Sequence, residues 1–165
     1  MIRKTVILSL ILSTSVYLTI TPNFAIADAA DPSLLEDKAQ IACLAENIYR
    51  EAGAESKAGQ LAVALVTMNR VNSGKFPDDV CSVVKQRSSK GCQFSWVCFK
   101  KPKMDTDLYN KVLGVATHVY NNYPTKIKDI TFGSLYYHAD SIDPGWNLRK
   151  TVVIGNHVFY TNKKA

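Results

Sequence analysis

Residues 47–70 read NIYREAGAESKAGQLAVALVTMNR, and this stretch decides how the chain folds. Its first part completes an apolar pattern of helical spacing, and its second part is a nearly continuous apolar run rich in small residues. Gly53 separates the two parts, so we expect one helix to end there and a second, deeply buried helix to follow. Glu51 and Glu55 flank this glycine, and the function of the stretch depends on what each acid does.

The first expected helix covers residues 33–52. Apolar residues recur through it at steps of three and four: Ile41, Leu44, Ile48 and Ala52. Ser33 is a suitable N-cap, and Glu36 three residues later completes a capping box. We expect Gly53 to end the helix in the left-handed conformation that glycine accepts at this position.

The rest of the chain predicts further helices and then a change to β structure. After the buried helix, which Gly74 and Pro77 end, the expected elements are a short helix, a loop, a long helix capped by Asp105 or Thr106, and two strands: residues 78–86, 87–103, 105–122, 130–140 and 152–162. The strands are short, β-branched and aromatic, and turn residues lie between them. We therefore expect a mainly α domain (α+β) with a small C-terminal β-hairpin or sheet.

The N-terminus has the pattern of a secretory signal peptide. A short basic head precedes an apolar run at residues 6–20, and residues 25–27 fit the small-x-small site of signal peptidase. Cleavage after Ala27 would give a signal peptide, an exported polar lead and a folded domain: residues 1–27, 28–32 and 33–163. An uncleaved membrane anchor is the weaker alternative, because the run is shorter than the roughly 20 residues that a spanning helix prefers.

The chain is basic, with a formal net charge of +6. Removing residues 1–27 deletes Arg3 and Lys4 and no acidic residue, so the exported chain carries +6 − 2 = +4. Such a charge suits an anionic extracellular partner, such as cell wall, lipid head groups or nucleic acid, or it serves solubility alone. The basic residues form no stripe or motif, so we expect no nucleic acid as a partner. No second segment is long and apolar enough to span a bilayer, so we expect no stable membrane insertion after cleavage.

Four cysteines remain in the exported chain: Cys43, Cys81, Cys92 and Cys98. An even number in an exported chain indicates disulfides, and three pairings are possible. We favour Cys92 with Cys98, which closes a small loop, and Cys43 with Cys81. Structural zinc is the competing interpretation, but the paired cysteines or clustered histidines that zinc prefers are missing, so we expect no metal.

The two glutamates of the opening stretch have opposite electrostatic surroundings. Glu51 lies in the last turn of a helix, where the negative end of the helix dipole favours the protonated acid. An acid with a raised pKa is what glycosidic bond cleavage needs, and the small residues after Glu51 leave room for a ligand. Glu55 lies where the next helix begins, so we expect it to be a structural, capping anion. The alternative for Glu51 is a solvated surface acid.

Aromatic and polar side chains in three segments form the second set of candidates, because aromatic faces stack on sugar rings and polar groups orient them. The candidate substrate-binding residues are Gln93, Phe94, Ser95, Trp96, Tyr137, His138 and Trp146. The alternative is that these aromatic residues pack in the core. The sequence has no nucleophile elbow and no phosphate-binding glycine loop, so we expect neither a serine nucleophile nor a cofactor.

Four motifs occur in a fixed order: Tyr49 to Val71, Phe76 to Val84, Gln93 to Ser95, and Ile154 to Tyr160. They match Y-x-E-A-x-x-E-x-x-x-G-Q-x-A-V-A-x-V-x-x-N-R-V, F-P-x-x-V-x-x-V-V, Q-F-S and I-G-x-H-x-F-Y. On these motifs residues 41–160 resemble the SleB/CwlJ-type cell wall hydrolase domain. The cysteines resemble the variety found in Gram-negative envelopes and their phages, so we expect a location in the periplasm or cell envelope. We also expect a monomer.

The resemblance implies a lysozyme-like helical fold that cuts peptidoglycan glycan strands between N-acetylmuramic acid and N-acetylglucosamine. Spore cortex members of the family act as lytic transglycosylases, and their single catalytic glutamate corresponds to Glu51. Many members read Glu-Ala-Arg-Gly-Glu where residues 51–55 of this chain read Glu-Ala-Gly-Ala-Glu. Gly53 takes the position of the arginine, so a cation that could change the pKa of the acid is missing there.

A mechanism with a single acid would explain why the sequence offers only one obvious catalytic carboxylate. Ordinary glycosidases use two carboxylates about 5–10 Å apart, and the sequence offers no obvious second one. In a lytic transglycosylase the C6 hydroxyl of the substrate itself attacks the anomeric carbon. Two alternatives stay open: a muramidase that uses water, assisted by Asp140 or Asp143, and a catalytically silent wall-binding module.

Overall fold

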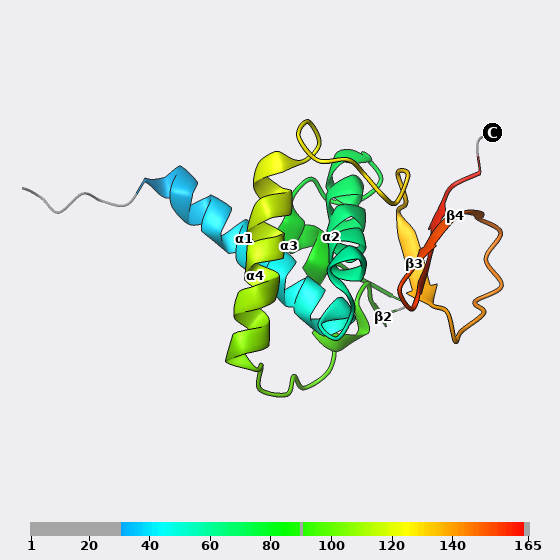
Figure 1. Cartoon of the computed structure of the whole chain (residues 1–165), viewed down its shortest axis with the longest axis horizontal. Coiled ribbons are helices and arrows are strands. Elements are labelled where there is room, and N and C mark those ends of the chain that lie inside the picture. The colour runs from blue at the N-terminus through cyan, green and yellow to red at the C-terminus, as the bar shows by residue number, and fades with distance from the viewer. Residues whose placement is uncertain (1–30, 90, 164–165) are drawn as a thin grey trace, which may run out of the picture.

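The computed structural model describes residues 31–89 and 91–163. Helices make up most of its regular secondary structure, and a sheet lies at the C-terminal end beyond α2 (Figure 1). The elements are α1 (Pro32–Ala52), α2 (Lys57–Asn72), α3 (Val80–Lys85), β1 (Arg87–Ser88), β2 (Gly91–Cys92), the 3-10 helix η1 (Ser95–Val97), α4 (Thr106–Asn122), β3 (Tyr136–Ala139), β4 (Arg149–Ile154) and β5 (His157–Thr161). The expected fold class is confirmed. The expected signal peptide, residues 1–27, lies outside the described residues, as does most of the lead.

Helix α1 starts one residue earlier than expected, and a different side chain caps it. The Asp31 carboxylate accepts hydrogen bonds from the Ser33 N–H and hydroxyl, both at 2.9 Å. Pro32 takes the first helical position, where its fixed φ is an advantage. The predicted capping box is therefore wrong, and Glu36 instead accepts a hydrogen bond from the Gln40 side chain at 2.6 Å.

The end of α1 differs from the expected left-handed cap. Gly53 has φ −58° and ψ −36°, which is right-handed, so that prediction is wrong. A turn follows the helix, in which the Glu55 N–H donates to the Ala52 carbonyl at 3.0 Å, and the Gln60 side chain donates to the Gly53 carbonyl at 3.3 Å. Space is the reason for glycine here, because a Cβ would lie 2.5 Å from the Tyr49 carbonyl oxygen and 3.3 Å from Leu108 Cδ2.

Helix α2 forms the centre of the domain. Nearly all its residues from Gly59 to Arg70 are buried. Helices α1, α3 and α4 pack around it, and the sheet covers the side that carries Ala62 and Val66 (Figure 1). Its many small residues allow this close approach. None of the helices in the described ranges is long and apolar enough to cross a bilayer.

Helices α3 and α4 both begin at an aspartate cap. The Asp79 side chain accepts a hydrogen bond from the Ser82 N–H at 2.8 Å and starts α3. Asp105 accepts one from the Leu108 N–H at 2.7 Å and starts α4, which confirms one of the two expected caps. The start of the long fourth helix therefore follows from local sequence.

The C-terminal sheet has three antiparallel strands in the order β3-β5-β4. The prediction of one strand over residues 152–162 is wrong. This stretch contains the end of β4, a turn and β5. Ile154 pairs with His157 across a two-residue turn. Gly155 has a φ of 58°, as the first central position of a type II′ turn requires.

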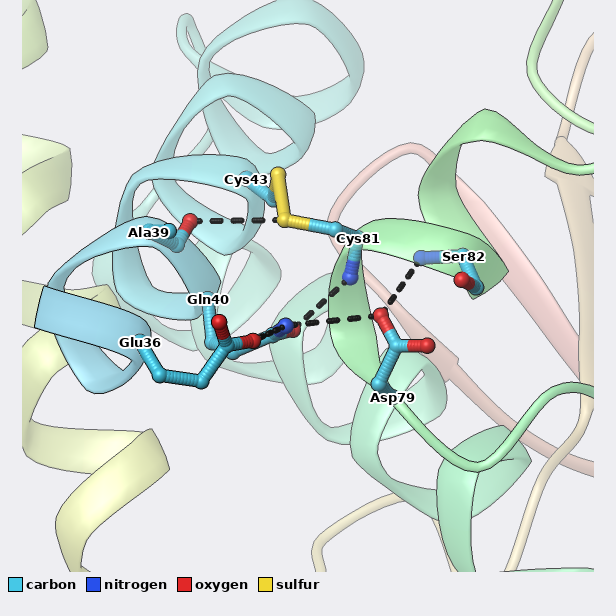
Figure 2. The surroundings of a disulfide bond; sticks show 7 residues. All are labelled: Glu36, Ala39, Gln40, Cys43, Asp79, Cys81 and Ser82. Carbon is cyan, nitrogen blue, oxygen red and sulfur yellow. Dashed lines mark hydrogen bonds between the residues drawn. A yellow bond between two sulfur atoms is a disulfide. The ribbon is translucent and has the colours of Figure 1, made fainter. Parts of the chain in front are cut away.

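Both favoured cysteine pairings are confirmed. Cys43 of α1 is bonded to Cys81 of α3, and Cys92 to Cys98 around η1. Beside the first bond, Gln40 of α1 accepts a hydrogen bond from the Cys81 N–H at 2.9 Å (Figure 2). Since no cysteine is free, the zinc interpretation loses its thiolate ligands.

The two disulfides predict different losses of stability. The Cys43–Cys81 bond spans 38 residues of sequence and the Cys92–Cys98 bond spans 6. In the chain-entropy picture these correspond to about 4 and about 2 kcal/mol. We expect the double serine variant of Cys43 and Cys81 to lose more free energy of unfolding in urea than that of Cys92 and Cys98. An equal or reversed order would contradict this account.

Candidate active site

A pocket of about 270 Å³ lies where four parts of the chain meet. It receives side chains from the last turns of α1 and α2, from the disulfide-bonded loop that follows β2, and from β3. Its lining residues are Glu51, Arg70, Cys92, Gln93, Phe94, Ser95 and Tyr137. The pocket therefore brings together the acid of the opening stretch and most of the Gln-Phe-Ser-Trp segment.

Of the described residues that line this pocket, Glu51 is the one with a carboxylate side chain. Its Oε2 accepts a hydrogen bond from the Tyr137 hydroxyl at 3.2 Å. Burial raises the pKa of Glu51, and Tyr137, Trp96 and the Arg70 charge oppose that rise. Trp96 Nε1 is buried without a hydrogen bond of normal geometry to a described residue, so its contribution comes from a weaker contact. The solvated-acid alternative does not fit this environment.

Tyr137 connects the acid to the sheet. It lies on β3 opposite Phe159 of β5, and its ring contacts the rings of Phe159 and His157 at centroid distances of 5.6 and 5.2 Å. Burial, with the nearby Glu51 carboxylate, raises the pKa of Tyr137 well above its usual value. Tyr137 therefore keeps its proton at neutral pH and acts as a donor to Glu51.

The Gln-Phe-Ser-Trp segment divides into anchoring and open side chains. Phe94 is buried and stacks with Trp96 at a centroid distance of 6.3 Å. The Lys101 ammonium lies 4.8 Å from the centre of the Trp96 ring. Gln93 and Ser95 are exposed at the pocket. The segment thus offers two polar side chains to a ligand and uses its two aromatic rings to hold the loop.

His138 and Trp146 are not brought to this pocket. His138 follows Tyr137 on β3, and successive side chains of a strand point to opposite faces. The His138 ring stacks on Tyr160 at 5.2 Å and contacts the edge of Trp146 at 5.4 Å. Both residues therefore belong to an aromatic cluster on the other face of the sheet from Tyr137.

Glu55 is an anion of structural use, but it does not cap α2. The N-cap is Ser56, whose hydroxyl accepts from the Gly59 N–H at 3.4 Å. Glu55 instead receives hydrogen bonds from the Asn156 side chain at 2.8 Å and backbone N–H at 3.4 Å. It also lies against Gly155, where a Cβ would come 2.2 Å from its Oε2. The predicted cap is wrong because the β4–β5 turn takes the carboxylate.

Arg70 was not among the residues singled out from the sequence. It is 2% exposed, and its Nε donates to the Leu135 carbonyl at 2.8 Å. The available signal was an arginine ending a helix that is otherwise almost wholly apolar, because an arginine is rarely buried without a purpose.

The other acids considered from the sequence, Asp140 and Asp143, are not placed as Glu51 is, and a further cavity lies elsewhere in the fold. Asp140 and Asp143 are exposed and do not line the pocket. A cavity of about 470 Å³ borders α1, α2, α3 and α4, beside the hydrogen bonds of Glu36, Gln40 and Asp79 in Figure 2. No described group of three His, Cys, Asp or Glu side chains is placed to hold a metal ion.

Comparison with known proteins connects this arrangement to wall-degrading enzymes. The family described as Cell Wall Hydrolase matches residues 54–160, a range that contains Arg70 and Tyr137 and begins just after Glu51. The spore cortex-lytic enzymes of Halalkalibacterium halodurans and Oceanobacillus iheyensis are 30% and 29% identical over 122 residues. These matches cover 72% of this chain but 34% and 40% of the relatives, so the chain spans little more than a third of their length.

Two solved structures have a similar fold. The catalytic domain of the germination-specific lytic transglycosylase SleB from Bacillus anthracis aligns with a TM-score of 0.54 at 26% identity, over 74% of this chain and 93% of that one. The catalytic domain of the Bacillus cereus SleB protein aligns with a TM-score of 0.54 at 24% identity, over 75% and 91%, and supports the fold alone.

The raised pKa of Glu51 predicts how stability depends on pH. The folded state holds this proton more tightly than the unfolded state. The contribution of Glu51 to stability is therefore complete below its unfolded pKa of about 4.3 and is lost as pH rises through the folded pKa. Glu51→Gln removes this dependence, so we expect the free energy of unfolding of the variant to gain on the wild type between about pH 4 and 8. A constant difference in urea denaturation across that range would contradict the prediction.

Proposed function

Because the chain belongs to the Cell Wall Hydrolase family, we propose that it is an exported enzyme that cleaves peptidoglycan glycan strands with Glu51 as its catalytic acid. The observation that carries this proposal is a carboxyl group with a raised pKa in a pocket that polar and aromatic side chains line. Burial keeps the acid protonated to a higher pH, and a protonated acid is what a departing sugar oxygen needs.

The proposed reaction is that of a lytic transglycosylase. Glu51 donates its proton to the glycosidic oxygen as the bond between that oxygen and the anomeric carbon of N-acetylmuramic acid breaks. The C6 hydroxyl oxygen of the same sugar then bonds to the anomeric carbon, and its proton returns to Glu51. The product is a 1,6-anhydro sugar, and no water is consumed. Tyr137 holds the Glu51 carboxyl in place through its 3.2 Å hydrogen bond.

The surroundings of Glu51 support one acid rather than two. A second carboxylate would have to lie about 5–10 Å from the first. Glu55 is held by the β4–β5 turn, and Asp140 and Asp143 lie outside the pocket lining. The alternative, a muramidase that uses water, would need one of these acids to act from outside the described pocket.

Substrate contacts are assigned to the open end of the pocket. We assign hydrogen bonding of the sugar to Gln93 and Ser95, which are exposed there, and positioning of the loop to Phe94 and Trp96. His138 and Trp146 would meet a glycan strand only where it passes the other face of the sheet. Export rests on the signal peptide pattern at residues 1–27, and N-terminal sequencing of the secreted protein tests it.

Activity of purified protein on peptidoglycan tests the proposal. We expect clearing in a zymogram and products with 1,6-anhydro ends in mass spectrometry. Glu51→Gln should lower the rate by about 10²–10⁴-fold, as expected for loss of a general acid. Glu55→Gln is the matched control, and we expect it to lower stability by about 1–2 kcal/mol through the Asn156 contact while it keeps activity.

The other outcomes identify the alternatives. Products with ordinary reducing ends would favour the water-using muramidase. Binding to insoluble peptidoglycan without release of soluble fragments would favour a silent binding module. Loss of activity in Glu55→Gln, with Glu51→Gln active, would overturn the residue assignment.

A further inference from the structure

Arg70 is a buried cation whose charge is not used by an ion pair. It is 2% exposed at the end of α2, and its Nε donates to the Leu135 carbonyl at 2.8 Å. Its Nη1 is buried without a hydrogen bond to any described residue. No carboxylate of residues 31–89 or 91–163 lies within 4.0 Å of it as a salt-bridge partner. Such an arrangement is costly, because a buried charge normally needs a partner.

Aromatic rings hold the guanidinium in one place. Its central carbon lies 5.0 Å from the centre of the Phe76 ring and 5.2 Å from that of Phe94. Contacts of this kind favour a cation and restrict its movement. Phe94 belongs to the disulfide-bonded loop, so Arg70 also connects this loop to α2. The cation is thus fixed beside the pocket rather than mobile on the surface.

The fixed cation and the acid share one pocket, since Arg70 and Glu51 both line it. We infer that Arg70 is a positioning residue of this site, a stationary positive charge that stabilises the Glu51 carboxylate after Glu51 has given up its proton. This inference rests on the proposed function and deepens it. It explains why a cation is kept in the core without a close partner: a tight ion pair would hold Glu51 ionised and leave no proton to donate.

The groups around Glu51 are consistent with an acid that gives up its proton and a cation that stabilises the carboxylate. Burial raises the pKa of Glu51, while the Tyr137 hydroxyl and the Arg70 charge act in the opposite direction. Burial lowers the pKa of Arg70, and the nearby Glu51 carboxylate acts in the opposite direction and favours the charged guanidinium. Glu51 can therefore give its proton away and still be stable as an anion until the proton returns.

Gly53 fits the same account. An arginine at this position would begin against the Tyr49 carbonyl oxygen and Leu108, where a Cβ would lie at 2.5 and 3.3 Å. Neither of these residues lines the pocket. The cation that lines the pocket together with Glu51 comes from α2, so a glycine at position 53 does not leave the pocket without a cation.

Two substitutions at Arg70 and one control test the inference. Arg70→Met removes the charge, and Arg70→Lys keeps it. Arg50→Met is the control, because Arg50 also has a buried Nε and lies 5.3 Å from the ring centre of Tyr49, yet is absent from the pocket lining. The side-chain carboxyl carbon of Glu51 is titrated by NMR in each folded variant, and kcat/KM on peptidoglycan is measured against pH.

We expect Arg70→Met to raise the Glu51 midpoint by about one pH unit and to move the alkaline limb of kcat/KM upward with it. Its kcat should fall about 10-fold or more, since the carboxylate formed during the reaction is less stable. Arg70→Lys and Arg50→Met should keep the wild-type midpoint within a few tenths of a unit.

An unchanged midpoint in Arg70→Met would overturn the inference, as would an equal rise in Arg50→Met. If Arg70→Met does not fold by circular dichroism, Arg70→Lys decides, and a clear rise of its midpoint overturns the inference. The titration needs no substrate. If the wild type leaves peptidoglycan intact, the proposed function is wrong. The midpoints of the Glu51 titration by NMR would still decide the role of Arg70.

Discussion

Helix α2 has to be covered along almost its whole surface, because buried side chains occur on every face of it. Three helices and the C-terminal sheet meet this requirement together (Figure 1). Most buried polar groups on such a helix need hydrogen-bond partners within the protein. Thr67 therefore accepts a hydrogen bond from Asn47 of α1 at 3.1 Å and donates to the Val63 carbonyl at 3.2 Å.

The polar end of α2 follows from the same constraint. The Asn69 side chain donates to Asp129, Thr131 and the Ser134 carbonyl at 3.0, 3.2 and 3.0 Å, and so attaches the segment before β3 to the helix. Arg70 bonds to Leu135 one residue further along that segment. These contacts fix the start of β3, and β3 in turn brings Tyr137 to Glu51.

The candidate site is thus a product of how the helical core is closed. Its acid comes from the end of α1, its cation from the end of α2, its tyrosine from the sheet, and its open polar side chains from a loop that the Cys92–Cys98 disulfide holds. Glu55 connects the start of α2 to the sheet, because it accepts hydrogen bonds from Asn156 in the β4–β5 turn. An acid buried with a fixed cation nearby is costly in stability and useful in chemistry, which is a common balance at functional sites.

The sequence by itself determined the features that depend on neighbours along the chain. Apolar periodicity located the helices, one of the two expected caps of the last helix is Asp105, and cysteine spacing favoured the observed disulfides. The assignment of Glu51 rather than Glu55 as the acid stays a prediction. Only the tertiary structure decided which distant groups would meet. In the folded protein Asn156 donates a hydrogen bond to Glu55, and Arg70 lines the same pocket as Glu51. His138 and Trp146 contact each other away from that pocket. The physical reason is that helix periods and caps act within a few residues, whereas partners for buried polar groups are chosen when whole elements pack.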